Sequence, residues 1–252
     1  MFAMSEETPS IIESEKVSQA KYGLLALPDT GLVGTIAVGH IIRSKKMREI
    51  GHVRSQALPP VIVVHNGEPK SPVRIYSEKD LIALVSETPL PLNTYRRLAP
   101  EIARWTKERE IQLLIILSGI PTQNRVEIEK PEIFCVGGTA QTRELAKSRG
   151  IPLLEEGFIA GPQALILNEC VEMQIPVVII LAQSHANFPD PGAAVSMLMR
   201  LNEAFGFDVE VESLKEQADE FRLRLRELMQ RTQQSAGDMQ KTQEQEIPAF
   251  YR

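Results

Sequence analysis

Cysteine is scarce in this chain of 252 residues, which contains only Cys135 and Cys170. Two cysteines do not make a disulfide framework, and each stands in an apolar stretch typical of a buried thiol. Four histidines are present, and none has a second histidine or a cysteine at zinc-ligand spacing. The sequence therefore predicts no metal site and no bound cofactor. The low cysteine content also indicates a reducing compartment, the cytoplasm.

Long hydrophobic runs and a targeting segment are also missing. The apolar runs at residues 113–117 and 177–182 are far too short to span a bilayer. Residues 1–18 are polar and acidic, without the basic and then apolar regions of a signal peptide. The net charge of −5 argues against nucleic acid and against an anionic membrane surface as partners. We expect neither kind of partner, and we expect residues 1–18 to be flexible.

No complete phosphate-binding motif is present. Gly31 and Gly34 follow a buried strand and open a helix, which is where an α/β fold can cradle a phosphate. Their spacing is neither G-x-G-x-x-G nor the Walker pattern with its lysine. We interpret Gly31 as a turn residue and Gly34 as a residue that permits close packing of the helix on the sheet.

A complete catalytic motif is absent as well. Asp29, Ser118, Thr139 and His185 each follow a strand, at the carboxyl edge of the sheet where ligands bind in open α/β folds. A Ser-His-Asp set could be drawn from them, but Ser118 lacks the G-x-S-x-G nucleophile elbow. We expect no catalytic residues. The alternative is a small-molecule hydrolase or phosphorylase that uses the edge near Asp29 and His185.

Short apolar strands alternate with helices over residues 22–205, a pattern typical of a mostly parallel sheet covered by helices. The sequence predicts one α/β domain at residues 19–208, with three layers and a parallel or mixed sheet. A cluster of strands at residues 50–86, with an Asn66-Gly67 turn, indicates an antiparallel or mixed part. The expected strands are 22–27, 50–57, 60–65, 73–76, 80–86, 111–117, 133–136, 151–154 and 176–182. The expected helices end near residue 43 and at residues 110, 148, 174 and 205.

Residues 209–231 differ from the rest of the chain. Apolar side chains recur there at alternating spacings of three and four, which predicts an amphipathic helix. The stripe consists of Val211, Leu214, Ala218, Phe221, Leu225 and Leu228. The pattern does not decide whether this helix packs on its own domain or lines a contact between subunits.

Residues 232–246 contain one large apolar side chain, Met239, and this composition predicts disorder. Residues 247–252 then read Ile-Pro-Ala-Phe-Tyr-Arg. Two aromatic residues at the end of a disordered tail indicate a docking segment, because partners capture C-terminal carboxylates in a known recognition mode. The alternative is a chain end that varies without a function.

Several short motifs follow one another over about residues 22–205. The first is Leu27-Pro-Asp-Thr-Gly-Leu-Val-Gly34, between the first strand and its helix. Others are Ser118-Gly119, Gly137-Gly138-Thr139 and Gly157-Phe-Ile-Ala-Gly-Pro162. Together, in this order, these motifs resemble the proteasome assembly chaperone family in its archaeal and bacterial branch.

This resemblance implies a fold similar to nucleoside phosphorylases and peptidyl-tRNA hydrolases, without a catalytic centre. It also implies a homo-oligomer, tetrameric or pentameric, that binds the α-subunits of the 20S proteasome without ATP. Phe250, Tyr251 and Arg252 match the hydrophobic–tyrosine–any-residue ending by which members of this group dock between α-subunits. The resemblance therefore predicts an assembly chaperone or an activator-like factor.

Overall fold

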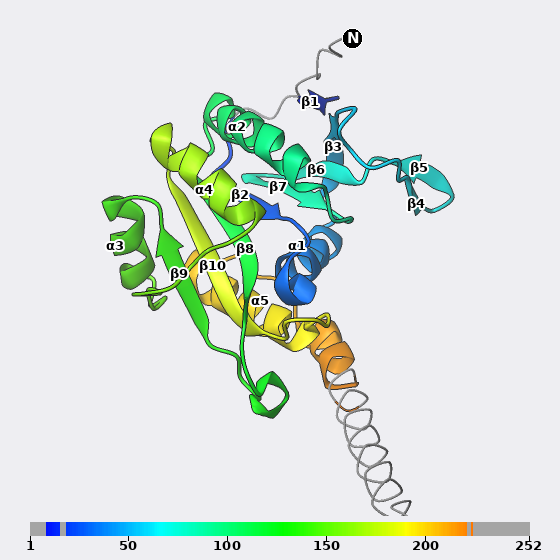
Figure 1. Ribbon diagram of the computed structural model, residues 1–252. Helices are drawn as coiled ribbons and strands as arrows, with labels where there is room; N and C mark the ends of the chain where they lie inside the picture. The colour runs from blue at the N-terminus through cyan, green and yellow to red at the C-terminus, as the bar shows by residue number, and fades with distance from the viewer. Residues whose placement is uncertain (1–8, 16–18, 221–222, 224–252) are drawn as a thin grey trace, which may run out of the picture.

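The computed structural model describes residues 9–15, 19–220 and 223, and within them it shows an eight-stranded mixed sheet (Figure 1). The strand order is β1-β3-β6-β7-β2-β8-β10-β9. The strands are β1 (Ser10–Glu13), β2 (Tyr22–Ala26), β3 (Arg48–Arg54), β6 (Val73–Glu78), β7 (Leu81–Ser86), β8 (Leu113–Pro121), β9 (Ile133–Gly137) and β10 (Val177–Ser184). A separate two-stranded hairpin consists of β4 (Val63–His65) and β5 (Glu68–Lys70).

The centre of the sheet is parallel. Strand β2 pairs in parallel with β7 and β8, and β8 pairs in parallel with β10. All five residues of β2 are buried, as expected for a strand that is covered on both faces. The continuous apolar runs that predicted these strands therefore reflect their central position.

Helices cover both faces of the sheet and give three layers. Helices α1 (Val33–Ser44), α3 (Ala140–Ser148) and α5 (Pro191–Phe205) contribute to one buried apolar cluster. Helices α2 (Leu92–Glu108) and α4 (Pro162–Glu172) contribute to the other cluster. The predicted α/β architecture with a mixed sheet is confirmed.

The predicted antiparallel part at residues 50–86 is also confirmed. Strand β6 pairs antiparallel with both β3 and β7. The predicted strand at 60–65 is shorter, because only Val63–His65 is extended and it pairs with β5 instead of the main sheet. Asn66 and Gly67 connect β4 and β5 with φ of 51° and 81°, which suits a tight hairpin turn.

The expectation of a flexible N-terminus over residues 1–18 is wrong for Ser10–Glu13. These residues form β1, which pairs antiparallel with β3 at the edge of the sheet. The Glu13 carboxylate accepts a hydrogen bond from Trp105 Nε1 at 2.8 Å and forms an ion pair with Arg109. Helix α2 therefore holds this short strand in place. Trp105 itself is buried in the core, as the sequence predicts.

The far edge of the sheet also differs from the expectation. Strand β9 is antiparallel to β10, and the expected strand at 151–154 is reduced to a single bridge between Leu153 and Cys135. Residues Ser118–Pro121, expected to end the preceding strand, continue β8 instead.

The described part of the predicted amphipathic segment follows α5. The Asn202 side chain exchanges two hydrogen bonds with the backbone of Val209, at 2.8 and 3.0 Å. Residues 212–220 are helical, with Leu214 and Ala218 buried against the domain. The remainder of the predicted helix, to residue 231, lies mainly outside the described residues. Within the described ranges, no helix is both long enough and apolar enough to cross a membrane.

Candidate functional site

The carboxyl edge of the parallel strands brings Asp29 and Ser118 together. The Ser118 hydroxyl donates a hydrogen bond to Asp29 Oδ2. Gln163, in the first turn of α4, donates to the same oxygen from Nε2 at 2.7 Å. These three side chains come from the loop after β2, from β8 and from α4, so they connect the sheet to the helix that covers it.

The environment of the Asp29 carboxyl is unusual. Burial raises the pKa of Asp29 from 3.8 to about 7, although the Ser118 hydrogen bond acts in the opposite direction. Its second oxygen, Oδ1, is buried without a hydrogen-bond partner among the described residues. The Asp29 carboxyl therefore changes between its protonated and ionised forms near neutral pH.

His185 belongs to a different cluster. Its backbone N–H donates to Asp190 Oδ2 at 3.1 Å, and Arg125 Nη2 donates to Asp190 Oδ1 at 3.0 Å. Asp190 also caps α5 by accepting from the Ala193 N–H at 2.9 Å. Burial lowers the pKa of His185, and Asp190 partly opposes this effect.

The Ser-His-Asp set that the sequence allows is therefore not assembled as a relay. The Ser118 proton points to Asp29, and none of the hydrogen bonds between described residues joins Ser118 to His185. Thr139, the other candidate at this edge, caps α3 in a capping box with Thr142. This structural role accounts for a threonine directly after β9.

Neighbouring atoms pack closely against Gly31 and Gly34, in the turn after β2 and at the start of α1. Gly31 has φ of 64°, and a Cβ atom there would lie 1.8 Å from Ser184 Oγ. A Cβ atom on Gly34 would lie 2.1 Å from the carbonyl oxygen of Leu117. The interpretation of Gly31 as a turn residue and Gly34 as a close-packing residue is confirmed.

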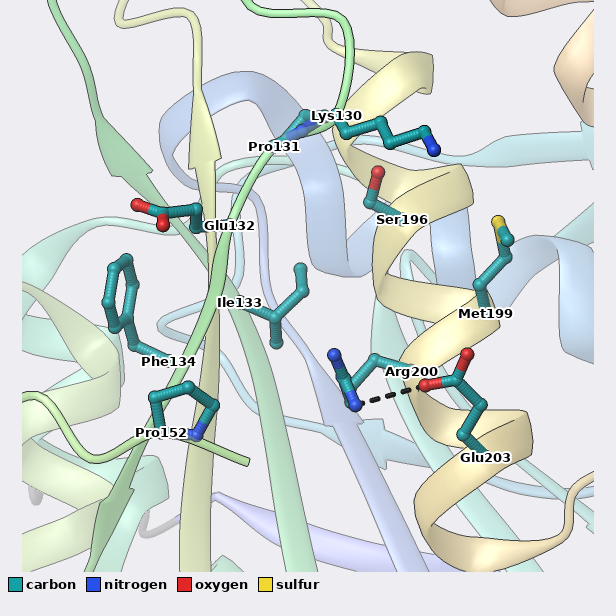
Figure 2. A pocket seen from close by; sticks show the side chains of 10 residues that line it. All are labelled: Lys130, Pro131, Glu132, Ile133, Phe134, Pro152, Ser196, Met199, Arg200 and Glu203. Atoms are coloured by element: carbon teal, nitrogen blue, oxygen red, sulfur yellow. Dashed lines mark ion pairs between the residues drawn. The ribbon is translucent and has the colours of Figure 1, made fainter. Parts of the chain in front are cut away.

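A hollow of about 400 Å³ lies between edge strand β9 and helix α5 (Figure 2). Ile133 and Phe134 belong to the strand, and Met199 and Arg200 belong to the helix. Arg200 forms an ion pair with Glu203 at 3.0 Å, drawn as a dashed line in Figure 2. Met199 is half exposed, so this hollow is a shallow apolar surface with a charged border.

A larger hollow, of about 830 Å³, lies between α1 and the β4–β5 hairpin. Arg74 of β6 is buried in its floor and forms ion pairs with Glu49 at 3.3 Å and with Glu87. His65 of the hairpin lies 3.1 Å from Glu87 and 2.6 Å from Arg74 Nη2. We call this space the Arg74 hollow.

Sequence reasoning did not identify Arg74, Arg125 or Gln163. A signal existed for Arg74, because an arginine stands inside the otherwise buried strand Val73–Glu78. No local signal points to Gln163, whose partner Asp29 is 134 residues away in the sequence. The predicted docking residues Phe250, Tyr251 and Arg252 lie outside the described residues.

The sequence of this chain is similar to a protein family and to a protein from an archaeon. A family model described as the PAC2 family matches residues 23–229. An uncharacterised protein of Methanocaldococcus jannaschii is 27% identical over 203 residues, which cover 81% of this chain and 83% of that protein.

Solved structures from Pyrococcus furiosus share the fold. PbaA, an archaeal homologue of proteasome-assembly chaperone, superposes with a TM-score of 0.79 and 25% identity, covering 90% of this chain and 99% of PbaA. PbaB, an archaeal proteasome activator, has a TM-score of 0.76 and 21% identity, covering 90% of this chain and 100% of PbaB. The similarity to both extends over nearly the whole of each solved chain.

Proposed function

The chain belongs to the PAC2 family, and on this basis we propose that it is a proteasome-binding protein, an assembly chaperone or an activator-like factor. The observation that carries the proposal is the likeness to PbaA, at 25% identity over 90% of this chain. The protein acts as a homo-oligomer, tetrameric or pentameric, without ATP. Its partners are the α-subunits of the 20S proteasome in the cytoplasm.

The docking element in this proposal is the ending Phe250-Tyr251-Arg252. Tyr251 anchors the segment through its ring and hydroxyl, since tyrosine is enriched at interface hot spots. Phe250 buries apolar area, and the carboxylate of Arg252 meets a positive charge of the α-subunits through charge-assisted hydrogen bonds. Several tails on one oligomer raise the overall affinity through their effective concentration.

Surface plasmon resonance on immobilised α-rings tests this docking model with three variants. Tyr251→Ala should weaken binding by roughly tenfold or more, the loss expected for a hot-spot residue. Extending the chain beyond Arg252 should weaken it similarly, because the extension displaces the carboxylate while every existing side chain stays. Arg252→Ala, the matched control, should have a mild effect. Unchanged binding of the extended protein would contradict the model.

The sheet edge near Asp29 and His185 is not a catalytic centre in this proposal. The support is geometric, since Ser118 donates to Asp29 while His185 lies with Asp190 and Arg125. Assays of nucleoside phosphorolysis and hydrolysis should detect no turnover. Turnover that disappears in His185→Ala would overturn this part of the proposal and favour the hydrolase or phosphorylase alternative.

A further inference from the structure

One phenylalanine of this chain is completely exposed. Phe158 lies in the loop before α4, and its side chain is 100% exposed, more than any other large hydrophobic side chain that the structure describes. Its neighbour Ile159 packs against the core on the face of the sheet that α2 and α4 cover. The loop is therefore held on the domain while the Phe158 ring points into solvent. Because aromatic side chains are enriched at protein–protein interfaces, this ring is suited to anchor another molecule.

The residues before Phe158 add negative charge to the loop. Glu155 and Glu156 are both exposed, and neither forms an ion pair with another described residue. A surface that receives this loop must therefore combine an apolar hole with a free cation.

The Arg74 hollow has the apolar hole. Its volume of about 830 Å³ lies within the range of typical binding sites. Its apolar wall is formed by Leu32, Ile36, Ile42, Met47, Val85 and Leu214. An aromatic ring that enters this space exchanges water for apolar contacts, which is the main driving force of association.

The Arg74 hollow also has a free cation. Its acids are already paired with Arg74 and Lys70. Arg43 of α1 lines the hollow and is exposed, and it forms no ion pair or side-chain hydrogen bond with any described residue. The hollow therefore suits a segment in which a large apolar side chain stands near an acid.

The sheet separates the Phe158 loop from the Arg74 hollow within one chain. Helix α1, which forms a wall of the hollow, packs on one face of the sheet, and the loop lies on the face that α2 and α4 cover. The loop can therefore enter only the hollow of another molecule. We propose that Phe158 of one copy of this chain inserts into the Arg74 hollow of a second copy, with Glu156 facing Arg43.

This inference rests on the proposed function in one respect, because it supplies the contact that joins the subunits of the proposed homo-oligomer. The loop and the hollow are different surfaces, so the contact is heterologous, and repeated contacts of this kind form a ring when the rotation closes. A pentamer has no two-fold axis and requires a heterologous contact.

Sedimentation velocity of the full-length protein tests the anchor. Phe158→Ser should weaken association between subunits by roughly tenfold or more, the loss expected for a hot-spot residue. Its unfolding midpoint should not change, because the exposed ring is not packed in its own domain. Leu92→Ser is the matched control, since it removes another exposed apolar side chain and should leave association unchanged. An oligomer that Phe158→Ser leaves intact would overturn the inference.

A mixture of two variants tests whether the loop and the hollow contact each other. Gly39 lines the hollow, and a Cβ atom there would meet only Arg43 Nη1, at 3.5 Å, so Gly39→Phe should fill the hollow without damage to the fold. Phe158→Ser keeps its hollow, and Gly39→Phe keeps its loop. Each variant alone should be monomeric, and an equal mixture should form dimers. A mixture that stays monomeric at high concentration would show that the two surfaces are not partners.

Charge reversal tests the pairing of Glu156 with Arg43. Glu156→Arg and Arg43→Glu should each weaken association by roughly tenfold or more, because each places like charges together. The double variant should recover association to within about threefold of the wild type. Glu172→Arg, at an exposed acid on α4, is the control and should have no effect. A double variant no better than the single ones would contradict this pairing.

Failure of this inference and failure of the proposed function give different results. If α-rings bound none of the proteins while Phe158→Ser still dissociated the oligomer, the proposed proteasome binding would fail and the inference would stand. If the wild type bound α-rings and its oligomer were insensitive to Phe158→Ser, the inference alone would be wrong. A monomeric wild type would overturn both the inference and the proposed assembly.

Discussion

The Asp29 carboxyl combines a buried position with two hydrogen bonds to one of its oxygens. Its place at the end of the first parallel strand was predictable, because the apolar run before it is continuous. Its contact with Gln163 was not, since that contact depends on how α4 packs over the sheet. At the scale of single residues, the sequence indicates where polar groups gather but not which of them touch.

Asp29→Asn should stabilise the protein at alkaline pH. The carboxyl has a pKa of about 7 in the folded protein and about 3.8 when unfolded, so the folded state binds its proton more tightly. The contribution of the protonated Asp29 carboxyl to the free energy of unfolding is fully present below about pH 4 and is lost as the pH rises through 7. We expect the variant to be more stable than the wild type by about 1–3 kcal/mol at pH 8, with little difference at pH 4. Urea unfolding at both pH values measures this, and a pH-independent difference would contradict it.

Asp190→Asn should destabilise the protein strongly. Asp190 and Arg125 are both buried, and removing one charge of such a pair leaves the other uncompensated. Asparagine keeps the capping oxygen for α5 but replaces Oδ2 with an NH2 group, so the loss combines the ion pair with the hydrogen bond from the His185 N–H. We expect a loss of about 3–5 kcal/mol in the free energy of unfolding. A loss below about 1 kcal/mol by urea unfolding would show that the pair contributes little.

Helix α1 contains two glycines with opposite surroundings, which gives a matched pair of substitutions. Gly34→Ala places a Cβ atom 2.1 Å from the Leu117 carbonyl, so helix and sheet must separate. We expect a loss of about 1–3 kcal/mol. Gly39→Ala meets only a flexible arginine end and should gain about 0.5–1 kcal/mol. Thermal unfolding of both variants should show shifts of opposite sign, and equal shifts would contradict the packing described for Gly34.

Strand β1 depends on one carboxylate. Glu13→Ala removes both the hydrogen bond to Trp105 and the ion pair with Arg109. Because Trp105 is the only tryptophan in the chain, its emission should shift to longer wavelength as β1 detaches. Glu15→Ala is the control, since its ion pair with Arg48 is exposed and such pairs contribute little. Identical spectra for the two variants would contradict the anchoring role of Glu13.

The central elements were predictable because their signals are local. Continuous apolar runs mark β2, β8 and β10, and Asp190 before Pro191 marks the start of α5. Strand β1 has only two apolar residues in Ser10–Glu13, and it is extended because β3 and α2 receive it. The antiparallel direction of β9 likewise follows from its pairing with β10, which no local pattern specifies.

At the scale of the whole molecule, the proposed function assigns separate roles to the docking segment and to the folded domain. We expect light scattering at micromolar concentration to show a homo-oligomer, and we expect Tyr251→Ala to leave its mass unchanged while it weakens α-ring binding. A monomeric wild type would contradict the proposed assembly. A smaller mass for Tyr251→Ala would show that the tail also holds subunits together.

The sheet order has a consequence for how the chain folds during synthesis. Strand β2 is made early, yet one of its two neighbours is β8, which begins about 90 residues later. At roughly 5–20 residues per second, the ribosome needs several seconds to supply that neighbour. Throughout this interval an apolar strand has an unpaired edge, which is a site for association with other nascent chains. We therefore expect slower translation between residues 26 and 113 to lower the yield of soluble protein, which expression with synonymous slow codons in that interval would measure.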